Sequence, residues 1–384
     1  MKTKIRIIGM VTVVCLWAVL CLCAWLKAPD AVSEAERRPL EQFPEVNSQT
    51  ILQGSFMQNF EEYTLDQFPL RDTFRSLKAL FHTNVLQQLD NNEIFIRDGY
   101  AAKINYPINS DSLAYAAEKF GYLYHTYLQD SQGRIFLAVV PDKGVYIGET
   151  SGYPGVDYGA FIEELSLQMP YAQVIDLKQA LTLEDYYRTD THWRQEKLLP
   201  VAKRICQALG VTPPGEADFT PVALERPFYG VYYGQAALPM DAETMYILQS
   251  DLLDGCLVTN HENCKPQKDG EGNVTFDHSK CEKSAVYNLN LLENPDMYDI
   301  FLSGMQGFVE IENPNASTDR ELIIFRDSFG SSLTPLLLQS YARVTVLDIR
   351  YVSSYSLQNL MDFHGQDVLF LYSTLVLNDS DSLG

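Results

Sequence analysis

Residues 321–329 read Glu-Leu-Ile-Ile-Phe-Arg-Asp-Ser-Phe. The apolar run from Glu321 to Phe325 predicts a buried strand, and the residues after Ser328 predict a helix. In α/β proteins the carboxyl ends of parallel strands meet at one edge of the sheet, and functional residues gather there. A helix N-terminus also offers free N–H groups and a positive dipole end to an oxyanion. Ser328 is therefore a candidate nucleophile, with helix capping by Asp327 or Ser328 as the alternative.

A second string, Thr-Asp-Thr-His-Trp at residues 189–193, supplies what a serine nucleophile lacks. His192 suits the role of base because imidazole titrates near neutral pH. Asp190 lies two residues earlier, on the same side of an extended backbone, where a carboxylate fixes the imidazole tautomer. The alternative is an exposed turn ahead of a helix.

Other apolar runs indicate how these two strings are held. Strands are predicted at 135–140, 173–177, 308–312, 344–349 and 367–372, and helices at 113–129 and 194–209, the second kinked or split by Pro200. This alternation predicts an α/β fold, a doubly wound sheet with flanking helices, over residues 101–384. Residues 213–299 are rich in Gly, Asp, Asn and Tyr and read as an irregular insertion with some β structure.

The N-terminal hundred residues have a different character. Residues 7–26 are apolar without one charge, long enough for a membrane span. Three basic residues precede them, which places the N-terminus in the cytoplasm. We therefore expect a cytoplasmic tip and signal anchor in residues 1–27, with the bulk of the chain outside the cell, against a cleaved signal peptide as the alternative. Residues 28–100 predict a linker and a helical segment, with helices at 56–65 and 71–89 and a strand at 93–97.

The net charge of the chain argues against one class of partner. The 384-residue chain carries a net charge of −21 and has no basic stripe, so nucleic acid is not an expected partner.

The two strings together resemble a known pattern. Asp-Thr-His-Trp with a downstream Asp-Ser-Phe looks like the signature of SGNH-hydrolase-like proteins that O-acetylate exopolysaccharides, such as the periplasmic alginate O-acetyltransferases. The nearer resemblance is to the DHHW family of Gram-positive bacteria. Further matching segments lie at 36–44, 66–72, 140–143 and 347–351.

Three positions depart from the family pattern. Thr191 stands where the family name has its first histidine, and Arg326 precedes Asp-Ser where Gly or Lys is more usual. The segment from Phe301 to Met305 resembles a family segment with Gly and a following Asn, but Met305 replaces that amide. If the Asn binds an oxyanion, its loss would cost about 3 kcal/mol of transition-state stabilisation.

The resemblance implies a role for each candidate residue. Ser328 would be the nucleophile, His192 the base and Asp190 its orienter, in acyl transfer through a serine ester without a cofactor or a catalytic metal. Candidate substrate-binding residues are Trp193, Arg326, Gly304 and Lys143. Lys143 and Arg326 would contact an anionic acceptor; the alternatives are that Lys143 is solvated and that Arg326 pairs with Asp327.

Three functions follow from this pattern. The first is an extracytoplasmic, membrane-anchored O-acyltransferase acting on a cell-surface or secreted polysaccharide, with a multi-spanning membrane acyltransferase as acyl donor. The second is a carbohydrate acetyl esterase with the same three side chains. The third is an inactive glycan-binding or scaffold protein.

One other cluster needs an explanation. Cys256, His261, Cys264, His278 and Cys281 fall within 26 residues. A disulfide, a zinc site or free thiols would each fit, and an oxidising exterior favours the disulfide. We expect no catalytic role for this cluster.

Overall fold

A computed structural model of the chain describes residues 2–151, 153–261, 264–270, 274–277 and 279–384. Contacts within the chain divide it into two units. The first contains Met1–Glu93 with Tyr233–Met240, and the second contains Ile94–Tyr232 with Asp241–Gly384. The second unit thus begins a few residues before the predicted boundary at residue 100.

The first unit is mostly helical. Its elements are α1 (Lys2–Leu26), β1 (Val32–Ser33), β2 (Arg38–Pro39), α2 (Ser48–Leu52), α3 (Ser55–Asp66) and α4 (Arg71–Asn84). Helix α1 is long and apolar enough to cross a membrane, a property that a secretory signal sequence shares. The helices predicted at 56–65 and 71–89 correspond to α3 and α4.

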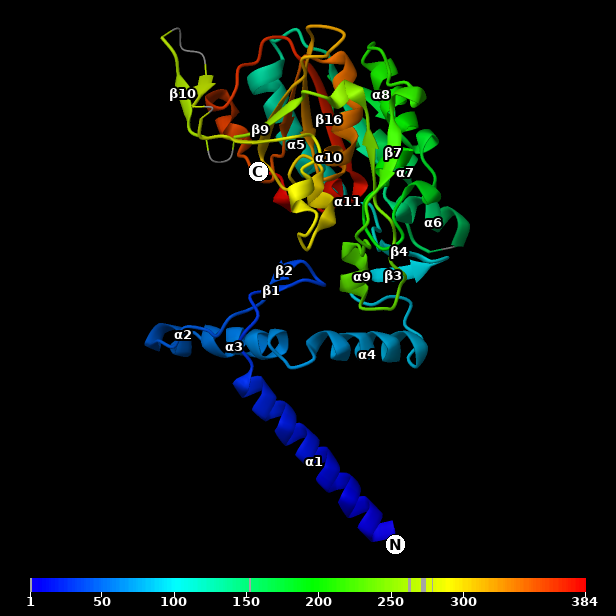
Figure 1. The fold of residues 1–384 in the computed structure, drawn as a ribbon, viewed down its shortest axis with the longest axis vertical. Helices are drawn as coiled ribbons and strands as arrows, with labels where there is room; N and C mark the ends of the chain where they lie inside the picture. Colours follow the sequence, from blue (N-terminus) through cyan, green and yellow to red (C-terminus); the bar gives the residue numbers. More distant parts are fainter. Residues whose placement is uncertain (1, 152, 262–263, 271–273, 278) are drawn as a thin grey trace. The chain divides into compact units, whose positions relative to one another are not determined.

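The second unit is built on an eight-stranded sheet in the order β12-β9-β13-β15-β14-β16-β5-β6. Figure 1 labels two of these strands, β9 and β16. Five neighbouring strands run parallel: β15 (Arg343–Leu347), β14 (Glu321–Arg326), β16 (Asp367–Ser373), β5 (Ile135–Val140) and β6 (Gln173–Asp176). The predicted strands therefore lie in the sheet within one or two residues of their expected ends. Strands β14, β16 and β5 are almost wholly buried, as expected where both faces of a parallel sheet are covered.

The remaining three strands differ from the doubly wound expectation. Strand β13 (Phe308–Glu312) pairs antiparallel with β15, and β9 (Leu257–Asn260) and β12 (Glu282–Ser284) extend that edge antiparallel. Part of the segment predicted as an insertion thus completes the sheet. The strands β9 and β12 are short and show little alternation of apolar and polar residues, so the sequence pattern did not predict them as part of the sheet.

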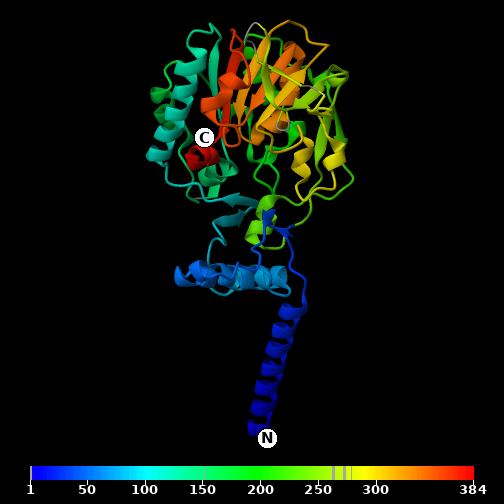
Figure 2. The same ribbon diagram turned by 90° about the vertical axis from the view of Figure 1, so that its left-hand side faces the viewer.

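Helices cover both faces of the sheet (Figures 1 and 2). Alternate strand residues pack on one face with α8 (Leu199–Ala208) and α10 (Phe329–Leu333), and on the other with α5 (Ser110–Leu123) and α7 (Tyr158–Gln168). The helix predicted at 194–209 begins only at Leu199, with Pro200 in its first turn. A separate 3₁₀ turn, Gln195–Lys197, precedes it, so the stretch is split just before Pro200, as one form of the prediction had it. The helix α8 itself is not kinked there, because a proline in the first turn gives up no helical hydrogen bond.

Shorter elements complete the chain. Strands β3 (Ile94–Arg97) and β4 (Tyr100–Lys103) form a hairpin, and β7 (Thr220–Ala223) pairs with β8 (Tyr246–Gln249). The others are α6 (Lys143–Ser151), α9 (Val231–Ala236), β10 (Pro266–Lys268), β11 (Val274–Phe276), α11 (Thr374–Leu377) and a π-helical turn, Tyr124–Leu128, after α5. Among the described residues, the 3₁₀ turns are Lys178–Ala180, Leu183–Asp185, Gln195–Lys197, Glu216–Asp218, Asp251–Leu253, Leu289–Leu291, Met297–Ile300, Thr334–Ser340, Ser354–Asn359 and Ser380–Ser382.

Candidate active site

The structure brings Ser328, His192 and Asp190 into one hydrogen-bonded chain. The Ser328 Oγ atom lies 2.8 Å from His192 Nε2, and His192 Nδ1 lies 2.6 Å from Asp190 Oδ1. An ionised carboxylate only accepts hydrogen bonds, so Nδ1 of the imidazole carries the proton. The Nε2 atom is then the acceptor for the serine hydroxyl, which is the arrangement a general base requires.

Ser328 is placed by the junction of β14 and α10. It occupies the N-cap position of α10, but its side chain makes no capping hydrogen bond. Instead Asp327 Oδ1 accepts from the Phe329 backbone N–H at 3.1 Å, and Asp327 Oδ2 accepts from Ser373 N–H at 2.7 Å. Asp327 thus ties the ends of β14 and β16 together. The Ser328 hydroxyl, half-buried, is left for His192.

The histidine and its carboxylate lie on a tight loop. Tyr186 and Trp193 form a β-bridge, and Tyr187 N–H donates to His192 O at 3.1 Å. Residues 188–191 form the tip of this hairpin-like turn. Asp190 and His192 are both buried, so the alternative of an exposed turn does not hold.

The tip is held by residues that the sequence did not mark. Glu243 accepts from the Arg188 N–H at 2.8 Å, and from both the N–H and the hydroxyl of Thr189 at 2.7 Å. Val231 N–H donates to Asp190 Oδ2 at 2.8 Å. A Cβ on Gly230 would come within 2.4 Å of the Asp190 backbone, so only glycine permits this approach.

These contacts leave Asp190 well fixed. Its Oδ1 accepts from the His192 backbone N–H at 3.0 Å as well as from the ring. Three N–H groups therefore converge on one buried carboxylate, which favours its ionised form. Thr191, at the departure from the DHHW string, accepts a hydrogen bond from the Tyr232 hydroxyl at 3.1 Å.

Tyr298 is a further residue that the sequence did not reveal. Its ring stacks on the His192 imidazole with centroids 3.8 Å apart and planes 10° apart. Its hydroxyl donates to Ser332 Oγ at 2.6 Å, and the Trp193 indole N–H donates to the same oxygen at 2.9 Å. Trp193 is fully buried and packs edge-on against Phe329, so it does not line a surface.

Lys143 is buried, with 2% of its surface exposed, so the solvated alternative is wrong. Its ammonium donates to Tyr187 O at 2.8 Å and to Arg188 O at 3.4 Å. Burial lowers its pKa to about 7, against the opposing effects of Asp190 and the neighbouring Glu243 and Asp142 carboxylates. The lysine therefore holds the loop that carries Asp190 and His192.

Arg326 and Gly304 meet beside β14. Arg326 is buried and pairs with Asp348 at 3.3 Å, and burial lowers its pKa. Its guanidinium also reaches Gly304 O at 3.5 Å. Gly304 has φ of +79°, which favours glycine, and the Met305 side chain that follows is 68% exposed. Arg326 thus joins the Phe301–Met305 segment to the strand that carries Ser328.

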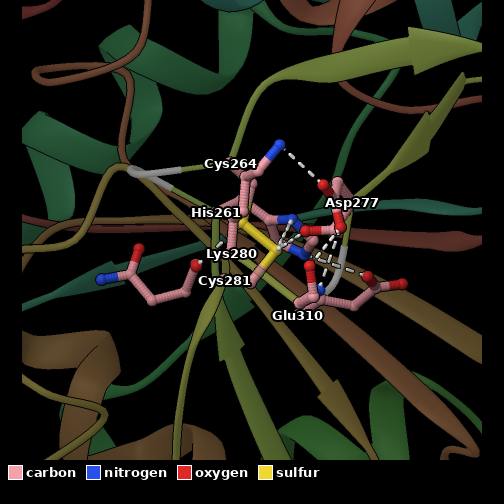
Figure 3. The surroundings of a disulfide bond; sticks show 8 residues. His261, Cys264, Asp277, Lys280, Cys281 and Glu310 are labelled. Atoms are coloured by element: carbon pink, nitrogen blue, oxygen red, sulfur yellow. Dashed lines mark hydrogen bonds and ion pairs between the residues drawn. A yellow bond between two sulfur atoms is a disulfide. The ribbon is translucent and has the colours of Figure 1, made fainter.

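The cysteine and histidine cluster lies on the β9–β12 edge of the sheet. Figure 3 shows the disulfide between Cys264 and Cys281 beside His261, whose Nε2 lies 3.1 Å from Glu310 Oε2. Cys256 is a buried free thiol. His278 lies outside the described residues. The ligand atoms of His261 and the two bonded cysteines are within 4.8 Å of one another, but zinc binds thiolates, which a disulfide does not offer.

Comparison with protein-family models and with curated protein sequences finds no match. Solved structures do match. A DHHW family protein from Eubacterium siraeum has a TM-score of 0.55 at 19% identity, and the match covers 77% of this chain and 95% of that one. Bacillus cereus PatB1 with a sulfonyl adduct has a TM-score of 0.55 at 18% identity, covering 76% and 96%. The expected resemblance to the DHHW family is confirmed, and at these identities it is a likeness of fold.

Proposed function

We propose that this protein is an extracytoplasmic, membrane-anchored O-acyltransferase that carries an acetyl group as an ester on Ser328 and passes it to a polysaccharide hydroxyl. The observation that carries the proposal is the continuous chain of hydrogen bonds from Ser328 through His192 to Asp190. The fold that it shares with the DHHW family protein and with PatB1 supports the same reading.

Each step assigns the proton to a stated atom. As Ser328 Oγ attacks the acyl carbon, its proton passes to His192 Nε2, and the buried Asp190 carboxylate stabilises the imidazolium. The leaving group then takes that proton. In the second half, the acceptor hydroxyl gives its proton to Nε2 while its oxygen attacks the ester. The bond from the acyl carbon to Ser328 Oγ then breaks, and Nε2 returns the proton to Oγ.

If the Asn of the family segment binds the oxyanion, this site has one donor fewer, because Met305 has no side-chain amide. The backbone N–H of Ser328, at the start of α10, would remain as a donor. Removal of one such donor costs about 10²- to 10³-fold in rate, so we expect a slow enzyme.

We propose that α1 anchors the chain in the membrane with the second unit outside. Within the described residues α1 is the one helix long and apolar enough to span a bilayer, so the chain itself cannot carry acyl groups across. A multi-spanning membrane acyltransferase would supply them.

A serine-reactive probe tests the nucleophile. The full chain in mild detergent should be labelled by a fluorophosphonate or a sulfonyl fluoride, and Ser328→Ala should abolish labelling. Ser331→Ala, one turn further along α10, is the matched control and should keep it. If wild type and Ser328→Ala react equally, the nucleophile is misassigned. A wild type that does not react at all would favour the glycan-binding or scaffold alternative over the acyltransferase.

Product analysis separates transfer from hydrolysis. Purified protein is given a soluble acetyl ester, with and without an oligosaccharide, and the products are identified by mass spectrometry. Acetylated oligosaccharide that depends on Ser328 supports the transferase. Free acetate alone, at a rate that the oligosaccharide does not change, would assign the protein as an acetyl esterase.

A further inference from the structure

Helix α4 presents its apolar side outward. Leu70, at its N-cap, begins a stripe in which apolar residues recur at intervals of four, three, four and four, the spacing of one helix face. Each is between 43% and 66% exposed. We call these residues the α4 face: Leu70, Phe74, Leu77, Phe81 and Val85.

The opposite side of α4 is polar and faces the protein. Ala79 is fully buried there. Arg75 pairs with Glu36 at 3.0 Å and donates to Gly234 O at 2.9 Å, and Arg71 pairs with the same glutamate. These ion pairs fix the rotation of the helix. A surface helix of a soluble protein has the reverse arrangement, with its apolar stripe toward the core.

Exposed apolar side chains are concentrated in this part of the chain. Among the described residues, fourteen exposed large apolar side chains lie between Val32 and Leu89, against seven in the much longer stretch from Ile94 to Gly384. Those before α4 include Ile51, Leu52 and Met57. Exposed apolar patches of this kind mark a surface that binds a partner or a membrane.

The position of α4 in the chain indicates that the α4 face contacts a membrane and not a protein partner. The span α1 ends at Leu26, and only residues 27–47 separate it from α2. Within that linker, the Asp30 backbone N–H donates to Gln67 Oε1 at 2.8 Å, and Gln67 caps α3 four residues before α4 begins. If α1 spans the bilayer, the α4 face is therefore held close to the outer surface at a high effective concentration.

We propose that the α4 face lies in the interfacial region of the outer leaflet, as a second attachment of the first unit to the membrane. A helix with Leu and Phe on one side and Arg and Lys on the other is typical of helices that lie in this plane. The inference rests on the proposed membrane anchor and goes beyond the proposed acyl transfer.

Charge has a minor part in this attachment. Arg71 and Arg75 form ion pairs with Glu36. Lys78 is exposed, so among the basic residues of α4 it is the best placed to meet lipid head groups. Insertion should therefore depend on apolar area and change little when anionic lipid is added.

Photo-crosslinking in vesicles tests the inference. The full chain is reconstituted in phosphatidylcholine vesicles with p-benzoylphenylalanine replacing Leu77, Asp72 or Val14 in separate variants. Asp72 is exposed on α4 but points away from the α4 face, and Val14 lies within α1. After illumination, mass spectrometry measures the lipid adduct at each position.

The expected result is a lipid adduct at Leu77 on the order of tenfold above that at Asp72. Adding phosphatidylglycerol should leave this ratio unchanged. An adduct at Val14 without one at Leu77 would overturn the inference while the anchor stands. Crosslinked dimers at Leu77 would assign the α4 face to a second copy of the chain instead. Esterase activity, measured on the same vesicles, reports the proposed function independently.

Discussion

Lys143 offers a quantitative test of how the site is built. Its ammonium is buried against the Tyr187 and Arg188 carbonyls, and burial lowers its pKa to about 7 from the usual 10.5. Between these two values the unfolded chain binds a proton that the folded chain does not. The free energy of unfolding must therefore rise with pH across that window.

The size of the effect follows from the two pKa values. The slope approaches 1.4 kcal/mol per pH unit, which gives about 2 kcal/mol between pH 7 and pH 9. Lys143→Met keeps the length of the side chain and removes the proton. We expect the variant to lack this gain, so that wild type becomes about 2 kcal/mol more stable relative to it over the same interval.

Urea unfolding at pH 7, 8 and 9 measures the difference, with the full chain in mild detergent. Trp193 fluorescence follows the second unit, where the indole is buried. Lys268→Met, on an exposed strand, is the matched control and should follow wild type. The buried tyrosines contribute equally to the pH dependence of each variant, so their contribution cancels in the difference between variants. Parallel pH dependence of wild type and Lys143→Met would refute the reasoning.

Four further predictions concern the site and its frame. Asp190→Asn should lower the esterase rate by about 10⁴-fold, because Nδ1 would lose its acceptor and the tautomer would no longer be fixed; the rate with a soluble acetyl ester measures this. Met305→Asn should raise that rate by about 10²-fold if the exposed side chain stands at the family's oxyanion position; no gain would argue against that position. Ser332→Ala should cost about 2 kcal/mol of unfolding free energy, because two buried donors lose their acceptor; urea unfolding checks it. Replacing Cys264 and Cys281 together by serine should cost about 3 kcal/mol for a loop of 17 residues; thermal unfolding with and without reductant checks it.

The sequence predicted the parts of the fold that carry strong local signals. Continuous apolar runs predicted β5, β14 and β16, because a strand that is buried on both faces is apolar at every position. The change from strand to helix at Ser328 was also visible locally, and so was the spacing of two residues between Asp190 and His192. Ser328 does follow the carboxyl end of β14, where that pattern put it.

The partners of the site could not be predicted in this way. Glu243, Gly230 and Tyr298 come from a segment without helical or strand periodicity, and their contacts depend on tertiary packing alone. The burial of Lys143 was not foreseen, because lysine is rarely buried and both acceptor binding and solvation left its ammonium at the surface. The helical period of α4 was visible in the sequence, but its rotation is set by Glu36, far from it in the chain.

The hydrogen bonds between Glu243 and the loop at residues 188–191 have a consequence for the kinetics of acylation. Because Arg188 and Thr189 are already held by that carboxylate, and Asp190 by Val231, the loop has little freedom left to lose when an acyl donor arrives. The base and nucleophile are in contact before any ligand binds. Acylation should then begin without a lag once the donor is added, however slow the acyl transfer itself is.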